Sequence, residues 1–106
     1  MATASQEREA ARDAVERCSQ VLRLNADDAE TWHALGAALA ALGDRAGAFT
    51  ALRNSALLDE TRAQTHLALG ELLFDTGRLD DALRCFECAA ALIAAPAQTA
   101  GHLATR

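Results

Sequence analysis

The sequence contains two copies of one pattern, and this repetition limits the fold more than any other feature of the chain. The segments TWHALGAALAALG, residues 31–43, and THLALGELLFDTG, residues 65–77, align when one is shifted by 34 residues. Continuing the shift pairs these identical residues: Thr31/Thr65, Leu35/Leu69, Gly36/Gly70, Leu39/Leu73, Gly43/Gly77, Ala48/Ala82 and Leu58/Leu92. A fixed period of this length is typical of proteins built by repeating one supersecondary unit.

Each unit is predicted to consist of two helices joined by a short turn. Apolar residues recur at helical spacing in both halves of each unit. The pattern predicts four helices, over residues 29–42, 45–58, 62–76 and 79–94. Because short turns join antiparallel neighbours, each unit is expected to form a helix hairpin.

The amino-terminal ends of the helices are indicated by capping residues. Two capping boxes are predicted from their spacing. Asp27 with Glu30 precedes the helix that starts near residue 29, and Thr61 with Gln64 precedes the helix that starts near residue 62. Asp44 is predicted to cap the helix over 45–58.

Glycine and proline indicate helix ends and close contacts. Gly43 and Gly77 follow the last apolar position of a helix and are predicted carboxyl-terminal caps. Gly36 and Gly70 lie inside helices, where glycine costs about 1 kcal/mol relative to alanine, so they predict a close approach of two helices. Pro96 is expected to end the last helix or to follow its end.

The period and its residues resemble the tetratricopeptide repeat, whose pattern is W-x2-L-G-x2-Y followed by A-x3-F, a small residue and a proline. The first unit matches at Trp32, Leu35, Gly36 and Ala48, and the second at Leu69, Gly70, Ala82, Phe86 and Ala89. The sequence departs from the pattern where Leu39 replaces the tyrosine, Leu52 the phenylalanine, His66 the tryptophan, and Glu60 and Ala94 the proline.

This resemblance implies an all-α fold in which antiparallel helix pairs stack as a short right-handed solenoid. Repeat 1 is expected over residues 29–62 and repeat 2 over 63–96. Shifting the pattern back predicts a half repeat over 7–28 that consists of the second helix only. Residues 97–106 are expected to form a capping helix or a tail, so that 1–106 is a single domain.

The composition restricts the partners and the location of the protein. The formal net charge is −5, and an acidic chain repels the phosphate backbone, so nucleic acid is not expected as a partner. No run of about 18 apolar residues predicts a membrane span, and the first residues lack the apolar segment of a secretory signal. With three cysteines, an odd number, the sequence predicts a cytoplasmic protein with reduced thiols.

Cys85 and Cys88 form a C-x-x-C pair, the clearest candidate for chemistry in the sequence. Such a pair occurs in redox sites and in halves of zinc sites. A redox pair starts at the amino terminus of a helix, where the thiol pKa is lowered, whereas this pair lies inside the helix over 79–94. Cys18 is the single further cysteine. Packing of all three cysteines is therefore favoured over catalysis or zinc binding.

The three histidines suggest no catalytic or metal site. His66 occupies the packing position of the repeat tryptophan, His33 is either a ligand contact or a surface residue, and His102 lies in the tail. No catalytic triad, phosphate-binding loop or carboxylate pair occurs in a suitable context. The protein is therefore not expected to be an enzyme or to hold a metal or a cofactor.

The resemblance places a binding surface on the first helix of each repeat, which lines the concave face in this family. The basic clamp with which some members bind acidic chaperone termini is missing at these positions, which are instead alanine-rich, apolar or acidic. Such a surface suits an apolar or amphipathic segment with a basic flank. The predicted contact residues are His33, Ala37, Ala41, Leu67, Glu71 and Phe74.

Two functions agree with these features. The first is a protein-protein interaction module, an adaptor or scaffold that binds a peptide or helical segment of a partner on its concave face. The alternative is a structural or assembly domain that self-associates weakly or packs within a larger protein. In that case the uncovered side of the helix over 7–24 would be the contact, because a repeat array needs covered ends.

Overall fold

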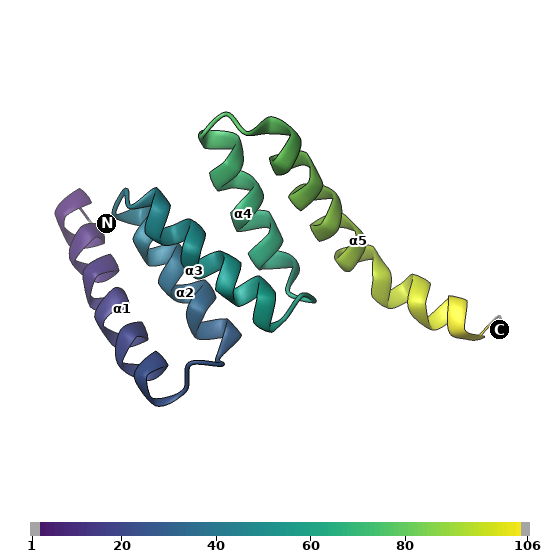
Figure 1. The fold of residues 1–106 in the computed structure, drawn as a ribbon, viewed down its shortest axis with the longest axis horizontal. Coiled ribbons are helices and arrows are strands. Elements are labelled where there is room, and N and C mark those ends of the chain that lie inside the picture. Colours follow the sequence, from purple (N-terminus) through teal and green to yellow (C-terminus); the bar gives the residue numbers. More distant parts are fainter. Residues whose placement is uncertain (1–2, 105–106) are drawn as a thin grey trace. The chain divides into compact units, whose positions relative to one another are not determined.

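The chain is helical throughout the part that the structure describes. A computed structural model describes residues 3–104, with side chains described for residues 3–94. This range contains no β-strand, which confirms the predicted all-α class. Its helices are α1 Ala4–Leu24, α2 Ala29–Ala41, α3 Arg45–Leu58, α4 Ala63–Asp75 and α5 Leu79–Ala104 (Figure 1).

The helices form two compact units, and each is described by itself. Unit 1, Met1–Glu60, contains α1, α2 and α3, and unit 2, Thr61–Arg106, contains α4 and α5. In unit 1, α2 packs against both α1 and α3, and in unit 2, α4 packs against α5 (Figure 1). The short turns between α2 and α3 and between α4 and α5 make each pair antiparallel, as predicted.

The interface between α2 and α3 is close because Gly36 has no side chain. A Cβ atom on Gly36 would lie 2.6 Å from Cγ of Leu52 and 3.2 Å from the backbone oxygen of Ala48. Ala48 and Leu52 are both buried. The prediction that Gly36 indicates a close approach of two helices is therefore confirmed.

Two polar side chains hold the start of α2. The buried hydroxyl of Ser55 on α3 donates a hydrogen bond of 2.8 Å to the backbone oxygen of Ala29. The indole N–H of the half-buried Trp32 donates to the backbone oxygen of Ala26 at 2.7 Å. Since each such bond contributes about 1 kcal/mol net, the two bonds fix α2 to α3 and to the preceding turn.

The apolar side of α1 lies against α2. Ala11 and Leu22 are buried, and Cys18 is half-buried. Val21 is exposed. α2 packs on this helix on the side of Ala11 and Leu22, and Val21 stays uncovered.

Both predicted glycine caps are confirmed. Gly43 and Gly77 have φ values of +85° and +82°, a conformation that glycine adopts without strain. The backbone N–H of Asp44 donates to the oxygen of Leu39 at 2.9 Å, and the N–H of Gly43 donates to that of Ala40 at 3.0 Å. These are the two bonds of a Schellman motif, which satisfies the last carbonyls of α2.

At the amino-terminal ends, one predicted cap is confirmed and two capping boxes are wrong. Asp44 caps α3, accepting a bond of 2.9 Å from the backbone N–H of Gly47. The cap of α2 is Asp28 rather than Asp27, and the cap of α4 is Arg62, without a side-chain bond. Because α2 and α4 begin at residues 29 and 63, the boxes predicted from Asp27 and Thr61 lie one residue too early.

A capping box does occur at the start of α1. Thr3 accepts from the backbone N–H of Gln6 at 3.1 Å, and the Gln6 side chain accepts from the N–H of Thr3 at 2.7 Å. The helix therefore begins at Ala4, three residues before the predicted start at residue 7. The reciprocal bonds satisfy two backbone donors that have no partner within the helix.

The prediction that Pro96 ends the last helix is wrong. α5 continues through Pro96 to Ala104, so residues 97–104 extend this helix. A proline inside a helix costs about 3 kcal/mol, because it removes one N–H and crowds a carbonyl. Alanines precede and follow Pro96, and alanine has the highest helix propensity, which favours continuation on both sides.

Candidate functional site

An exposed apolar stripe on α4 is the strongest candidate for a binding surface in unit 2. Leu67, Glu71 and Phe74 are spaced by four and three residues, which places them on one side of the helix. All three are exposed, and Phe74 retains 60% of its accessible surface. A phenylalanine with this exposure contributes little to the core, so the stripe is available to a partner.

α4 is held in place by its contact with α5, which reaches the edge of this stripe at Gly70. A Cβ atom on Gly70 would lie 2.6 Å from Cε1 of Phe86, so the α4 backbone lies directly against that ring. Leu69 and Leu73 are buried. Leu67 and Phe74 lie one turn before and after Gly70 and stay exposed beside this contact, which confirms the predicted close approach at Gly70.

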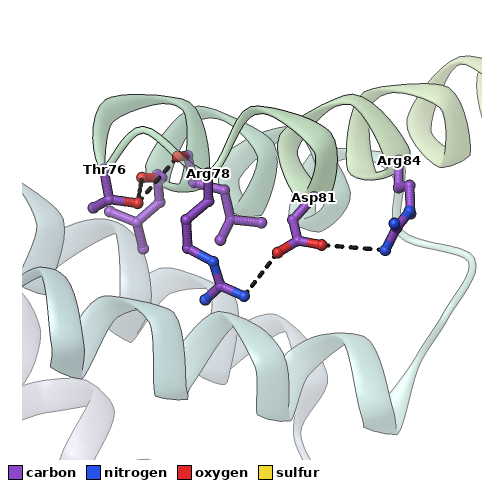
Figure 2. A network of polar contacts seen from close by, with 6 residues as sticks. Thr76, Arg78, Asp81 and Arg84 are labelled. Atoms are coloured by element: carbon purple, nitrogen blue, oxygen red, sulfur yellow. Dashed lines mark hydrogen bonds and ion pairs between the residues drawn. The ribbon is translucent and has the colours of Figure 1, made fainter.

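The end of α4 that carries Phe74 is held by a Schellman motif. The N–H of Gly77 donates to the oxygen of Phe74 at 3.0 Å, and the N–H of Arg78 donates to that of Leu73 at 2.8 Å. The hydroxyl of Thr76 donates to the oxygens of Leu72 and Leu73 at 3.2 and 3.0 Å (Figure 2). The backbone that presents the Phe74 ring is therefore well defined.

Asp81 holds two arginines near the start of α5. It accepts from Arg78 at 2.7 Å and from Arg84 at 3.2 Å (Figure 2). Both arginine side chains are mostly exposed, and exposed ion pairs of this kind contribute at most about 1 kcal/mol. Their role is therefore local, at the first turns of α5.

The predicted contact residues of unit 1 form a separate stripe on α2. His33, Ala37 and Ala41 are spaced by four residues each and share one side of the helix. Ala37 and Ala41 are exposed, whereas His33 is half-buried and has an interaction within the protein. This stripe is shallow, because two of its three side chains are single methyl groups.

The environment of the cysteines opposes thiolate chemistry. Burial raises the pKa of Cys85 above its ordinary value, and the neighbouring Cys88 and Asp81 raise it further. Burial also raises the pKa of Cys18, against a smaller opposing effect of Arg17. The thiolate is the nucleophile and the metal ligand, and these shifts disfavour the thiolate form of Cys18 and Cys85.

The described residues contain no arrangement of side chains typical of a metal site. Among them, no three histidine, cysteine or acidic side chains lie close enough together to hold a metal ion. No helix among them combines the length and the apolar character that crossing a bilayer requires.

Sequence reasoning missed a second set of exposed apolar residues, on α5. Leu79, Leu83 and Ile93 are each more than half exposed. The signal was present in the sequence, because the helix predicted over 79–94 has apolar residues on two adjacent sides rather than one.

Comparisons with known proteins identify the fold. No protein-family model matches the chain, and no curated protein matches its sequence. Among solved structures, the crystal structure of MamA, a tetratricopeptide-like protein, is similar with a TM-score of 0.79 and 18% sequence identity. The match covers 83% of this chain and 52% of the MamA chain, so the chain spans about half the length of that neighbour. It shows that the chain has a helical-repeat fold of the tetratricopeptide type.

Proposed function

We propose that this protein is a non-enzymatic protein-protein interaction module, an adaptor or scaffold, that binds a peptide or helical segment of a partner protein. The observation that carries the proposal is the exposed ring of Phe74, which shares one side of α4 with the exposed Leu67. The α2 stripe of His33, Ala37 and Ala41 is proposed as a further contact surface in unit 1. The general association of tetratricopeptide-type folds with protein partners supports this function.

The free energy available at Phe74 is large enough to matter for binding. Burying an apolar side chain of this size contributes roughly 1.5–3 kcal/mol. At about 1.4 kcal/mol for each factor of ten, this energy changes the dissociation constant about tenfold to a hundredfold. Aromatic residues are also frequent among the few residues that dominate binding at interfaces.

The charge of the α4 stripe indicates the chemistry of the partner. Glu71 lies between Leu67 and Phe74 on the exposed side, and Asp75 follows at the end of the helix. A basic residue in the partner would complement these carboxylates, while an apolar side chain contacts Phe74. The proposed partner is therefore an apolar or amphipathic segment with a basic flank. The cytoplasm is the proposed location, since the described cysteines are free thiols.

The test is affinity capture from a lysate of the source cells, followed by calorimetry on the captured partner. Phe74→Ala is expected to weaken binding about tenfold to a hundredfold, with unchanged helical content by circular dichroism. Leu57→Ala is the matched control, since Leu57 is an apolar residue on α3 that is 67% exposed. If both variants bind as tightly as the wild type, the assignment to α4 is wrong.

The alternative, self-assembly, makes a different prediction about mass. A concentration-independent monomer in size-exclusion chromatography with light scattering favours the adaptor. A mass that rises with concentration, and that Val21→Glu reduces, favours assembly through α1, because Val21 is exposed there.

A further inference from the structure

α5 carries an apolar stripe beside the side that contacts α4. Ala82 and Ala89 are buried and lie on the side of α5 that packs on α4. Leu79, Leu83 and Ile93 are 58%, 57% and 64% exposed. With the exposed Ala90 they follow helical spacing, so all four border the α4 contact on the side of the helix that also carries Phe86, whose ring lies against Gly70. These four residues are called the α5 stripe.

The internal repeat relates the α5 stripe to a surface of α1 that is covered. A shift of two periods, 34 plus 34 residues, aligns Leu79 with Ala11, Leu83 with Val15 and Ala90 with Leu22. In unit 1, α2 packs against α1, where Ala11 and Leu22 are buried and Val15 is half-buried. Three residues of the stripe therefore have equivalents on a side of α1 that a helix covers in unit 1, whereas Ile93 aligns with Asn25, which follows α1 and is exposed.

The covering helix in unit 1 shows what kind of surface fits. Gly36 of α2 contacts α3. Ala38 lies about 200° around the helix from Gly36, on nearly the opposite side, and it is also buried. α1 also packs on α2, and we assign the burial of Ala38 to that contact. Thr31, Leu35 and Leu42 lie on the same side as Ala38 at helical spacing. A helix that covers such a stripe thus presents small residues and leucine.

The charge beside the α5 stripe adds a second requirement. Asp80 and Glu87 lie three residues before and four residues after Leu83, and both are exposed. Neither takes part in the ion pairs that Asp81 forms with Arg78 and Arg84. A helix lying on the stripe would bring its own edge next to these two carboxylates, so arginine or lysine at that edge would be complementary.

We propose that the α5 stripe docks an amphipathic helix of a partner protein, with small residues and leucine on its contacting side and basic residues along one edge. The contact would reproduce the packing of α2 on α1. It involves residues of α5, whereas the binding proposed above involves residues of α4 and α2.

The probe for the test is derived from α2 itself. It is a stapled helical peptide with the sequence of residues 28–42, carrying A34R and A41R. Ala34 and Ala41 are exposed in α2 and lie next to the side that contains Ala38. They are seven residues apart. Asp80 and Glu87 have the same spacing, so the two arginines of the peptide can face the two carboxylates. Titration into the full ¹⁵N-labelled chain is expected to shift the amide signals of the α5 stripe.

The matched variants decide the outcome. Leu83→Asp is expected to weaken peptide binding at least tenfold, whereas Leu57→Asp, which changes an equally apolar exposed residue on α3, is expected to leave it unchanged. The absence of shifts on α5 at millimolar peptide, or an equal loss in both variants, would overturn the proposal. A dimer of the peptide-free chain that forms at higher concentration, and that Leu83→Asp abolishes, would also overturn the proposal. In that case a second copy of the chain would cover the stripe.

Discussion

Gly70 of α4 lies against the edge of the Phe86 ring, so that a Cβ atom added to it would be 2.6 Å from Cε1 and 2.7 Å from Cδ1. The same relationship occurs in unit 1 between Gly36 and Leu52. In both units the helix pair is held close by a glycine on the first helix and a large apolar residue on the second. Packing thus explains why glycine recurs inside the first helix of each repeat.

Alanine at these two positions is expected to test that packing. Gly36→Ala should lower the free energy of unfolding by about 1–2 kcal/mol, because overpacking exceeds the gain of about 1 kcal/mol in helix propensity. Gly70→Ala should lower the free energy of unfolding less. The half-buried ring of Phe86 can move away from the added methyl group, whereas Leu52, which is 2% exposed, has no room to do so. Urea denaturation measures both, and a more stable Gly36→Ala variant would contradict the argument.

The capping glycines are expected to respond for a different reason. A Cβ atom on Gly43 or Gly77 would meet no atom within 4 Å, so that alanine there causes strain without a clash. The positive φ of each residue should make Gly43→Ala and Gly77→Ala cost about 1–2 kcal/mol. Thermal unfolding gives the difference, with Gly43→Asn as control, since asparagine tolerates this conformation better. Equal losses for alanine and asparagine would exclude this explanation.

The repeat made the helices predictable from the sequence, because each feature is seen twice. Gly36 and Gly70 predicted close packing, and Gly43 and Gly77 predicted helix ends, since glycine at equivalent positions requires a local physical cause. The boundaries of α3, Arg45–Leu58, were also predicted, because Asp44 is a clear cap.

Other features depend on information that the pattern lacks. Asp27 and Asp28 are adjacent, and a shift of one residue decides which of them caps α2. Pro96 has an unfavourable local effect that the alanine-rich helix around it outweighs. The exposure of Phe74 agrees with the predicted site, but exposure alone does not identify a partner. His33 was expected on the binding surface; it is half-buried and takes part in an interaction within the protein.

The cysteines are expected to react in a fixed order. Cys88 is exposed, whereas Cys85 is half-buried and its pKa is raised by burial, by Cys88 and by Asp81. Iodoacetamide should therefore modify Cys88 first at pH 8, while modification of Cys85 should increase most steeply above its ordinary pKa of 9.0. Mass spectrometry of the single-cysteine variants measures both rates. Faster reaction of Cys85 at pH 8 would show that the thiol is activated instead.

The same pKa shifts predict a loss of stability at alkaline pH. A folded-state pKa above the unfolded value means that the unfolded chain releases its proton first as the pH rises. The neutral Cys18 and Cys85 thiols thus make their full contribution to the free energy of unfolding below pH 9.0, their ordinary pKa. This contribution is lost as the pH increases further. Urea denaturation between pH 7 and 10 measures this loss. The free energy of unfolding should decrease less with pH in the double variant, Cys18→Ser and Cys85→Ser, than in the wild type. An identical loss in both proteins would contradict this.

The charge on α4 gives a prediction that separates electrostatic from apolar binding. Glu71 is exposed between Leu67 and Phe74, so a basic partner segment should be attracted to it. Glu71→Lys is expected to weaken that partner more at 20 mM salt than at 500 mM, because screening over about 10 Å at 0.1 M reduces both attraction and repulsion. Phe74→Ala should instead weaken binding by a similar factor at both salt concentrations, because apolar burial is not screened. Calorimetry with the captured partner measures all four cases. If Glu71→Lys has the same effect at both concentrations, the partner segment has no basic flank at this position.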